Sequence, residues 1–224
     1  MVSKPKKFEI AQSFLTQMQK GAPIRVLEIG ATDVTDGIIK EVIGGGEHYK
    51  LNIERSHLGS KPDSIVGDGT RMPFADGSFD VVLCFDMIVH LIEPDDMILE
   101  AQRVLKKGGV LVISTINLAN IYNRILLMLG FSPLGYSPTR YRVGLPYPPA
   151  RSDLGHKSIF TYKALRDLLK LHDFEIVKSV GYCYYEPFYK HQRTEVGFFR
   201  FRVMMNKILP KEMREGMIFF AKKR

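Results

Sequence analysis

Short apolar runs alternate with helically spaced apolar residues along most of this 224-residue chain. Runs typical of buried strands lie at 25–29, 49–54, 64–66, 79–85, 109–115, 174–180 and 217–221. Apolar residues three or four positions apart predict helices at 8–19, 37–43, 94–105, 118–129 and 162–172. Because strands that alternate with helices form parallel sheets covered on both faces, we expect an α/β fold. It is a doubly wound, mostly parallel seven-stranded sheet with helices on both faces and an antiparallel last strand at the sheet edge.

The chain length fits one domain over residues 1–224. Residues 1–20 contain the N-terminal helix, and residues 188–224 form a basic C-terminal extension that includes the last strand. Lys106–Gly109 places two cations and then two glycines after the helix 94–105, which predicts its end. Residues 117–157 lose all periodicity from position 130 onward, so we expect a lid or acceptor-binding segment there.

Cysteine usage and the N-terminus indicate the compartment. Cys84 and Cys183 are the only cysteines, and neither has a second Cys or His at metal-ligand spacing, so no metal site is expected. The Lys-rich start is followed by an amphipathic stretch rather than an apolar signal core, and no window is apolar enough to span a bilayer. We expect a cytoplasmic protein.

The net charge of +8 is concentrated at the C-terminal end. Residues 188–224 contain ten Lys and Arg against three Glu, which is +7, so the other 187 residues carry only +1. The cations are interleaved with Phe198, Phe199 and Phe201. Such a segment is typical of contact with nucleic acid, anionic lipid or an acidic substrate, and also of a solvated surface.

Candidate chemistry follows four of the predicted strands. The residues are Glu28 and Gly30, then Asn52 and Glu54, then Asp68 between two glycines, and finally Phe85 and Asp86. In a doubly wound sheet ligands bind outside the carboxyl ends of the strands, so acceptors from separate loops converge there. Acidic or amide groups at such ends can accept hydrogen bonds from a ribose diol or an exocyclic amine.

Residues 25–115 resemble the methyltransferase type 11 group of class I S-adenosylmethionine methyltransferases, whose fold is Rossmann-like. The resemblance is carried by "VLEIGA", "GDGTRMPFADGSFDVVLCFDMIVHL" and "RVLKKGGVLVIST". It continues more loosely through "GHKSIFTYKALRDLLKLHDFEI" and leaves out the basic end. It implies an enzyme that uses S-adenosyl-L-methionine as its cofactor.

The resemblance also assigns cofactor contacts residue by residue. For the methionine part of the cofactor, it implies that Glu28 contacts the amino group through water, that Gly30 and Ala31 line this side of the site, and that the Phe85 backbone contacts the methionine end. For the rest of the cofactor, it implies that Asn52 or Glu54 holds the ribose and that Asp68 accepts from the adenine amine beside Gly69. Two departures leave open a catalytically inactive binding protein. Thr32 and Val34 replace expected glycines of the first loop, and Asn52 replaces the usual acid.

Methyl transfer from a sulfonium needs mainly positioning and exclusion of water, and a general base only for a protonated acceptor. The candidates for that base are His156, His90 and Asp86. Tyr122, Tyr136, Arg142 and Tyr147 are candidates for acceptor contacts from the lid.

The expected acceptor is a small molecule, glycan or lipid precursor, methylated on oxygen or nitrogen. The sequence "CFDM" follows the fourth strand in place of an Asn-Pro-Pro-aromatic motif, and no Pro-Cys pair is present, which argues against two types of base methylation. The alternatives are an RNA methyltransferase that uses the basic end, an inactive cofactor-binding or interaction protein, and peripheral membrane contact through 118–129.

Overall fold

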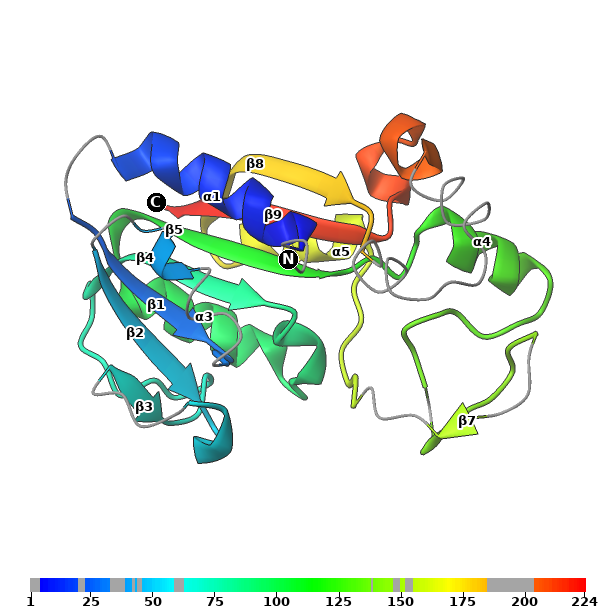
Figure 1. The fold of residues 1–224 in the computed structure, drawn as a ribbon, viewed down its shortest axis with the longest axis horizontal. Helices are drawn as coiled ribbons and strands as arrows, with labels where there is room; N and C mark the ends of the chain where they lie inside the picture. The colour runs from blue at the N-terminus through cyan, green and yellow to red at the C-terminus, as the bar shows by residue number, and fades with distance from the viewer. Residues whose placement is uncertain are drawn as a thin grey trace.

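A seven-stranded sheet in the order β3-β2-β1-β4-β5-β9-β8 forms the centre of the computed structural model (Figure 1). The structure describes residues 5–19, 23–32, 39–41, 43, 46–58, 63–137, 139–146, 150–151, 155–184 and 204–224. The strands are β1 (Arg25–Ile29), β2 (Glu47–Asn52), β3 (Ser64–Val66), β4 (Phe79–Phe85), β5 (Leu105–Ile116), β8 (Phe174–Tyr182) and β9 (Gly216–Lys223). The first five are parallel, and β9 is antiparallel to both of its neighbours. The predicted fold class is confirmed.

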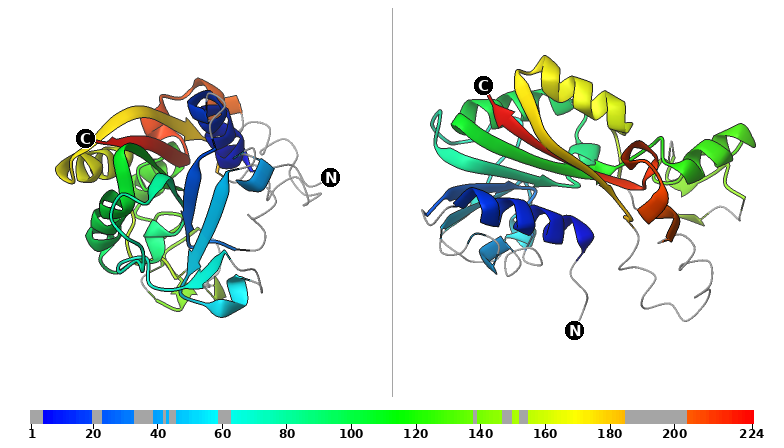
Figure 2. Two further views of the ribbon diagram at one scale, coloured as in Figure 1. Left: turned by 90° about the vertical axis from the view of Figure 1, so that its left-hand side faces the viewer. Right: turned by 90° about the horizontal axis from the view of Figure 1, so that it is seen from above.

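Helices cover both faces of this sheet (Figure 2). α1 (Lys6–Gln19) lies on one face, and α3 (Pro94–Val104) and α5 (Tyr162–Leu171) lie on the other. α4 (Ile121–Met128) lies beyond the end of the sheet (Figure 1). Short 3-10 turns are η1 (Arg55–His57), η2 (Ile88–His90) and η3 (Lys211–Met213). Residues 39–41 and 43 of the predicted helix 37–43 are helical, and its other residues lie outside the described ones. No helix among the described residues is long and apolar enough to cross a membrane.

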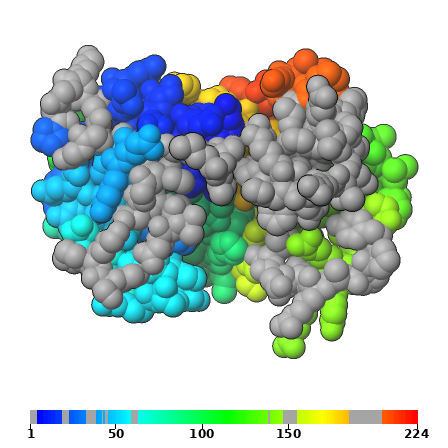
Figure 3. Space-filling view, viewed as in Figure 1, coloured from blue at the N-terminus to red at the C-terminus, as the bar shows by residue number. Residues whose placement is uncertain are grey.

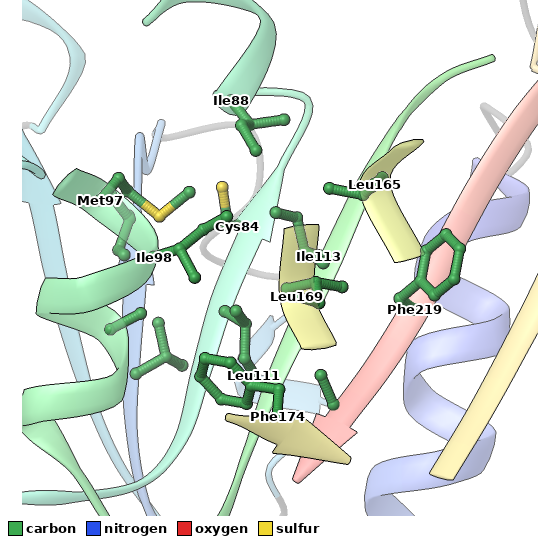
Figure 4. Packing of buried hydrophobic residues seen from close by; sticks show 14 of the residues in the cluster. Cys84, Ile88, Met97, Ile98, Leu111, Ile113, Leu165, Leu169, Phe174 and Phe219 are labelled. Atoms are coloured by element: carbon green, nitrogen blue, oxygen red, sulfur yellow. The ribbon is translucent and has the colours of Figure 1, made fainter. Parts of the chain in front are cut away.

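The sheet separates two apolar clusters. Phe8 and Leu15 of α1 pack with Val26 and Val81 on one face. On the other face, Leu165 and Leu169 of α5 lie over β5, and Met97 and Ile98 of α3 lie beside Cys84 of β4 (Figure 4). Burying apolar faces on both sides is the main favourable term in forming such a layered fold.

The last strand lies inside the sheet, which corrects the expectation that it occupies the edge. β9 pairs with β5 on one side and with β8 on the other, so β8 is the edge strand. Residues 216–221 are all buried, whereas β8 mixes buried and exposed positions. The unbroken apolar run at 217–221 is what a strand covered on both faces requires.

The segment Lys106–Gly109 belongs to β5 rather than to a loop after α3. α3 ends at Val104, and Leu105 already pairs with Phe79 of β4. Gly108 has a φ of 78°, and a Cβ on Gly109 would lie 3.0 Å from the backbone oxygen of Asp80, so the two glycines let β5 bend against its neighbour.

Arg103 of α3 fastens the loop that leads into β4. Its guanidinium donates to the carbonyls of Met72 and Phe74 and to the carboxylates of Asp76 and Glu100. The hydrogen bonds to the carboxylates of Glu100 and Asp76 raise the pKa of Arg103 above its ordinary value. Residues 72–76 of the motif that carries much of the family resemblance are therefore held against α3. The predicted turn at 76–77 is present.

The segment after β5 is more ordered than expected. α4 begins at Ile121 rather than 118, because Asn120 caps it by accepting from the backbone N–H groups of Tyr122 and Asn123. The stretch expected to be irregular contains a small hairpin, β6 (Tyr141–Arg142) with β7 (Ala150–Arg151).

Candidate active site at the carboxyl ends of the strands

The strand order reverses between β1 and β4, which lie side by side at the middle of the sheet. From β1 the chain continues outward to β2 and β3, and from β4 it continues the other way to β5. The pairing of β1 with β4 ends at Ile29 and Cys84, so the residues that follow diverge there. This is the position where doubly wound sheets bind ligands.

The first loop is held in place by the end of β2. The N–H groups of Gly30 and Ala31 both donate to the carbonyl of Leu51, and the Asn52 amide donates to the carbonyl of Ala31 at 2.8 Å. Gly30 has a φ of 72°, and a Cβ there would lie 2.6 Å from Cγ of Met87. A side chain at position 30 would therefore both strain the backbone and displace Met87.

Two expected ribose contacts lie at the end of β2 in different environments. Both ends of the Asn52 amide are engaged by backbone, since its oxygen accepts from the N–H of Glu54. Glu54 itself is exposed, with its carboxylate 3.6 Å from the ring of His57. Asn52 therefore fixes the loop geometry, and Glu54 presents the more accessible acceptor.

Asp68 stands exposed on the loop after β3. Its Oδ1 accepts from the N–H and from the hydroxyl of Thr70, both at 2.8 Å. Gly69 lies against the end of β1, where a Cβ would come within 2.8 Å of Ile29 and 3.0 Å of Met87. Met87 thus packs between the loops that follow β1 and β3 and links them.

Glu28 lies on the sheet face that α1 covers, one residue before the end of β1. Its carboxylate is only 2% exposed and lies 3.1 Å from Nε2 of His48 on β2. The position at the strand end agrees with the expected role, but the first partner of the carboxylate is a side chain of the protein.

Asp86, directly after β4, is bonded to three distant parts of the chain. Its carboxylate accepts from Lys7 of α1, from the hydroxyl of Tyr184 at 2.9 Å and from the hydroxyl of Ser114 at 3.2 Å. Its φ of 56° lies in the left-handed region, which Asp adopts more readily than most residues. The preceding Phe85 packs its ring on Phe8 of α1, with centroids 4.9 Å apart.

We expect Asp86→Ala to lower the free energy of unfolding by about 2 kcal/mol, because it removes three hydrogen bonds to a part-buried carboxylate. Asp86→Asn should cost about half as much, since Asn tolerates a positive φ and still accepts a hydrogen bond. Urea unfolding of both variants measures the difference. Equal losses would show that the hydrogen bonds which Asn can still accept contribute nothing to stability.

The two histidines expected near the acceptor are brought together. The rings of His90 and His156 meet edge to face with centroids 5.1 Å apart. Nδ1 of His156 lies 2.6 Å from the carbonyl of Gly135, and Nδ1 of His90 lies 3.3 Å from the carbonyl of Gly155. Because a carbonyl can only accept, the neutral ring of His156 carries its proton on Nδ1 and keeps a lone pair on Nε2.

The half-buried position of His156 favours this neutral form. Burial lowers the pKa of His156 below its ordinary value, and the neighbouring His90 and Arg142 act in the same direction. The hydrogen bond to Gly135 and the charge of Asp86 oppose the shift without cancelling it. A lone pair on Nε2 is therefore available at neutral pH.

The other candidates from the lid are placed unevenly. Arg142 lies in β6, and its buried Nε makes no hydrogen bond within the described part of the chain. Tyr136 is exposed and Tyr122 is half-buried on α4. Tyr147 lies outside the described residues, as does Val34 of the first loop.

Neither cysteine is placed for chemistry. Cys84 is fully buried in β4, and burial raises the pKa of its thiol to about 12. Cys183 is buried beside Glu215. The described residues contain no group of three or more His, Cys, Asp or Glu that could hold a metal ion.

Part of the basic end serves the fold. Arg214 donates to the carbonyls of Gly181, Lys207 and Leu209, and Lys223 donates to the carbonyl of Leu105. Residues 188–203, including the Phe-rich part, lie outside the described residues.

The partners of Asp86 were not anticipated from the sequence. Lys7 is 79 positions away from Asp86, and Tyr184 is 98 positions away. No local pattern marks either residue, because only the sheet topology brings α1 and the end of β8 to the end of β4.

Comparison with protein families and curated proteins identifies relatives. Residues 31–113 match the methyltransferase domain family, type 11. A sterol 24-C-methyltransferase of Gibberella zeae is 34% identical over 70 residues, which are 31% of this chain and 18% of that protein. A ubiquinone/menaquinone biosynthesis C-methyltransferase of Burkholderia mallei is 27% identical over 118 residues, covering 48% of this chain and 47% of its own. The matched segments thus span less than half the length of these relatives.

Solved structures share the whole fold at low sequence identity. A S-adenosylmethionine-dependent methyltransferase from Archaeoglobus fulgidus is 16% identical with a TM-score of 0.60, covering 96% of this chain and 94% of its own. A geranyl diphosphate C-methyltransferase from Streptomyces coelicolor, solved with S-adenosyl-L-homocysteine, is 11% identical with a TM-score of 0.61. It covers 96% of this chain and 79% of its own.

Proposed function

We propose that this chain, whose residues 31–113 match the type 11 methyltransferase domain, is a class I S-adenosylmethionine methyltransferase that transfers a methyl group to a small amphipathic acceptor. The observation that carries the proposal is the convergence at the reversal of strand order, where the loops after β1, β2, β3 and β4 meet.

The residues present fit the cofactor. Gly30 keeps its left-handed backbone, and the altered first loop is still fastened at both Gly30 and Ala31. Asp68 uses one carboxylate oxygen for Thr70, which leaves the other for an exocyclic amine. Glu54 is the more accessible ribose acceptor, and Gly69 and the Phe85 backbone border the same space. Glu28 would act behind this layer, together with His48.

When bound, the cofactor supplies an activated methyl group on a sulfonium. The protein's part is to orient the acceptor and to move one proton. The lone pair on Nε2 of His156 takes up the proton that the methylated substrate loses, and His90 contacts the ring of His156 edge to face. Asp86 is a positioning residue in this scheme, because Lys7, Ser114 and Tyr184 occupy its carboxylate.

Two features support an acceptor with an apolar body and an anionic or polar end, which is the chemistry of a lipid precursor. The segment from 117 to 152 contains four Arg and no acidic residue. The buried Nε–H of Arg142 makes no hydrogen bond within the described residues, so it can donate to a bound anion. The named substrates of the relatives include sterols, quinones and a prenyl diphosphate. Those relatives methylate carbon, so a carbon acceptor joins oxygen and nitrogen as the atom attacked.

Calorimetric titration with S-adenosylmethionine and S-adenosylhomocysteine tests the cofactor site. We expect wild-type binding, and Asp68→Asn should weaken it about tenfold or more, because the new amide presents a donor to the adenine amine while still accepting from Thr70. Asp63→Asn, at an exposed position before β3, serves as the matched control. No binding by the wild type would refute the proposed function, and unchanged binding by Asp68→Asn would refute the assignment of Asp68.

A further inference from the structure

The helix α4 buries a polar residue and exposes several of its apolar residues. Its one fully buried residue is polar: Asn123 donates to the carbonyls of Leu118 and Leu134 and accepts from the N–H of Leu134. Its apolar side chains face outward instead. Met128 is 86% exposed and Leu129, which caps the helix, is 67% exposed, with Ile125 and Leu127 about half exposed. A surface helix of a globular protein normally has the opposite arrangement.

Further apolar side chains are exposed outside α4. In the segment that follows, Tyr136, Tyr141 and Val143 are exposed. The helical residues 204–208 lie at the same end of the molecule as α4 in both views (Figures 1 and 2), and Met204 and Ile208 are exposed there. Exposed apolar residues gathered at one end of a molecule are typical of interaction sites.

The charged residues of the segment after β5 have one sign. No Asp or Glu occurs between Glu100 and Asp153, whereas Arg124, Arg140, Arg142 and Arg151 fall in the part after β5. Arg124 and Arg140 are exposed, and so is Lys207 in the helical residues 204–208. Exposed apolar side chains accompanied by exposed cations match the interface of a bilayer with anionic headgroups.

We propose that the outward face of α4 and residues 130–143, with the helical residues 204–208, docks on a membrane surface that contains anionic phospholipid. A second copy of the chain would bring the same arginines face to face, which disfavours self-association. Nucleic acid would use the cations and leave the exposed aliphatic side chains of Met128 and Leu129 without a role.

The docking surface is the outer side of the acceptor segment. Asn123, on the inner side of α4, is bonded to Leu134, and the following Gly135 is bonded to His156. Docking would therefore bring the bilayer next to the acceptor side of the site. The inference does not depend on the proposed function, because it predicts vesicle binding without cofactor or turnover.

Co-sedimentation with phosphatidylcholine vesicles, with and without phosphatidylglycerol, tests the proposal. We expect the wild-type protein to sediment only with the anionic vesicles and to be released as salt is raised. Met128→Ser should lower the partition coefficient about tenfold, and Arg140→Gln should lower it roughly fivefold. In Figure 3 the green atoms of α4 lie at the right-hand edge of the molecule.

Matched control variants distinguish docking through this surface from nonspecific adsorption to the vesicles. Leu171→Ser, at a 75% exposed position ending α5 near α3, and Arg166→Gln on α5 should leave sedimentation unchanged. Circular dichroism shows that the variants remain folded. The proposal would be overturned by absent sedimentation with anionic vesicles, by equal losses in the controls, or by single-stranded RNA binding that Met128→Ser weakens while vesicle binding is absent.

Discussion

Replacing His156 with alanine is expected to lower kcat by at least about a hundredfold, within the range for loss of a general base. The ring is oriented by the hydrogen bond between its Nδ1 and the carbonyl of Gly135, and it presents Nε2 as the proton acceptor. Formation of S-adenosylhomocysteine is measured with a panel of quinol, sterol and prenyl diphosphate acceptors, and the most active acceptor is used for the variants.

The pH profile distinguishes a base from a packing residue. A base works in its neutral form, so activity should fall as the pH drops through the pKa of His156. Burial lowers this pKa below its ordinary value, so activity should persist to a lower pH than an unperturbed histidine allows. His156→Ala should lose that acidic limb.

His172→Ala is the matched control for this experiment. His172 follows the C-terminal end of α5, and its ring is hydrogen-bonded to Asp95 of α3. The kcat of this variant should stay unchanged. If His156→Ala kept kcat within a few-fold and retained the acidic limb, the ring would serve only to hold the loop at Gly135.

The second large effect is expected at Phe219 in β9. Phe219 is fully buried, and its ring lies 4.7 Å from that of Tyr162 of α5, centroid to centroid. Phe219→Ala should lower the free energy of unfolding by about 3–5 kcal/mol, because it removes a large side chain from a core closed on both sides. Urea unfolding followed by circular dichroism measures the loss.

Val177→Ala on the edge strand β8 provides the comparison, since Val177 is exposed and should cost well under 1 kcal/mol. A similar small loss at both positions would contradict the central place of β9. If β9 were at the edge, Phe219 would have an open side into which neighbouring chains could relax.

The sequence was sufficient to predict the strands of the seven-stranded sheet, because most of them are apolar runs bounded by turn residues. β3 and β4 were predicted at their observed bounds, and the turn at 76–77 is present, with a φ of 62° at Gly77. The position of β9 could not be predicted in the same way. Strand order depends on pairing between segments a hundred positions apart, and no local pattern records it.

Hydrophobic periodicity also misled at α4. Apolar residues at helical spacing predicted a helix, which is present. The pattern does not indicate which face of the helix packs against the rest of the protein. Asn123 takes the inner position because its amide satisfies three backbone groups at once. Packing of the following loop decides this, and that loop shows no period.

The candidate cofactor residues follow the strands that the sequence predicted, while their hydrogen-bond partners were not foreseen. The sequence placed Asp68 and Gly30 beside one another through the fold rule for strand ends. The links of Asp86 to Lys7 and Tyr184 depend on how α1 crosses the sheet. The assigned roles of these residues remain predictions until the titrations are made.

The interior position of β9 also has a consequence for biosynthesis. β5 ends at Ile116, but the strand that completes its outer side begins only at Gly216. During translation the edge of β5 is therefore open, and β8 has no partner, until β9 has emerged from the ribosome. The nascent chain carries an unpaired apolar edge through much of its synthesis, so chaperone binding should concentrate on this interval.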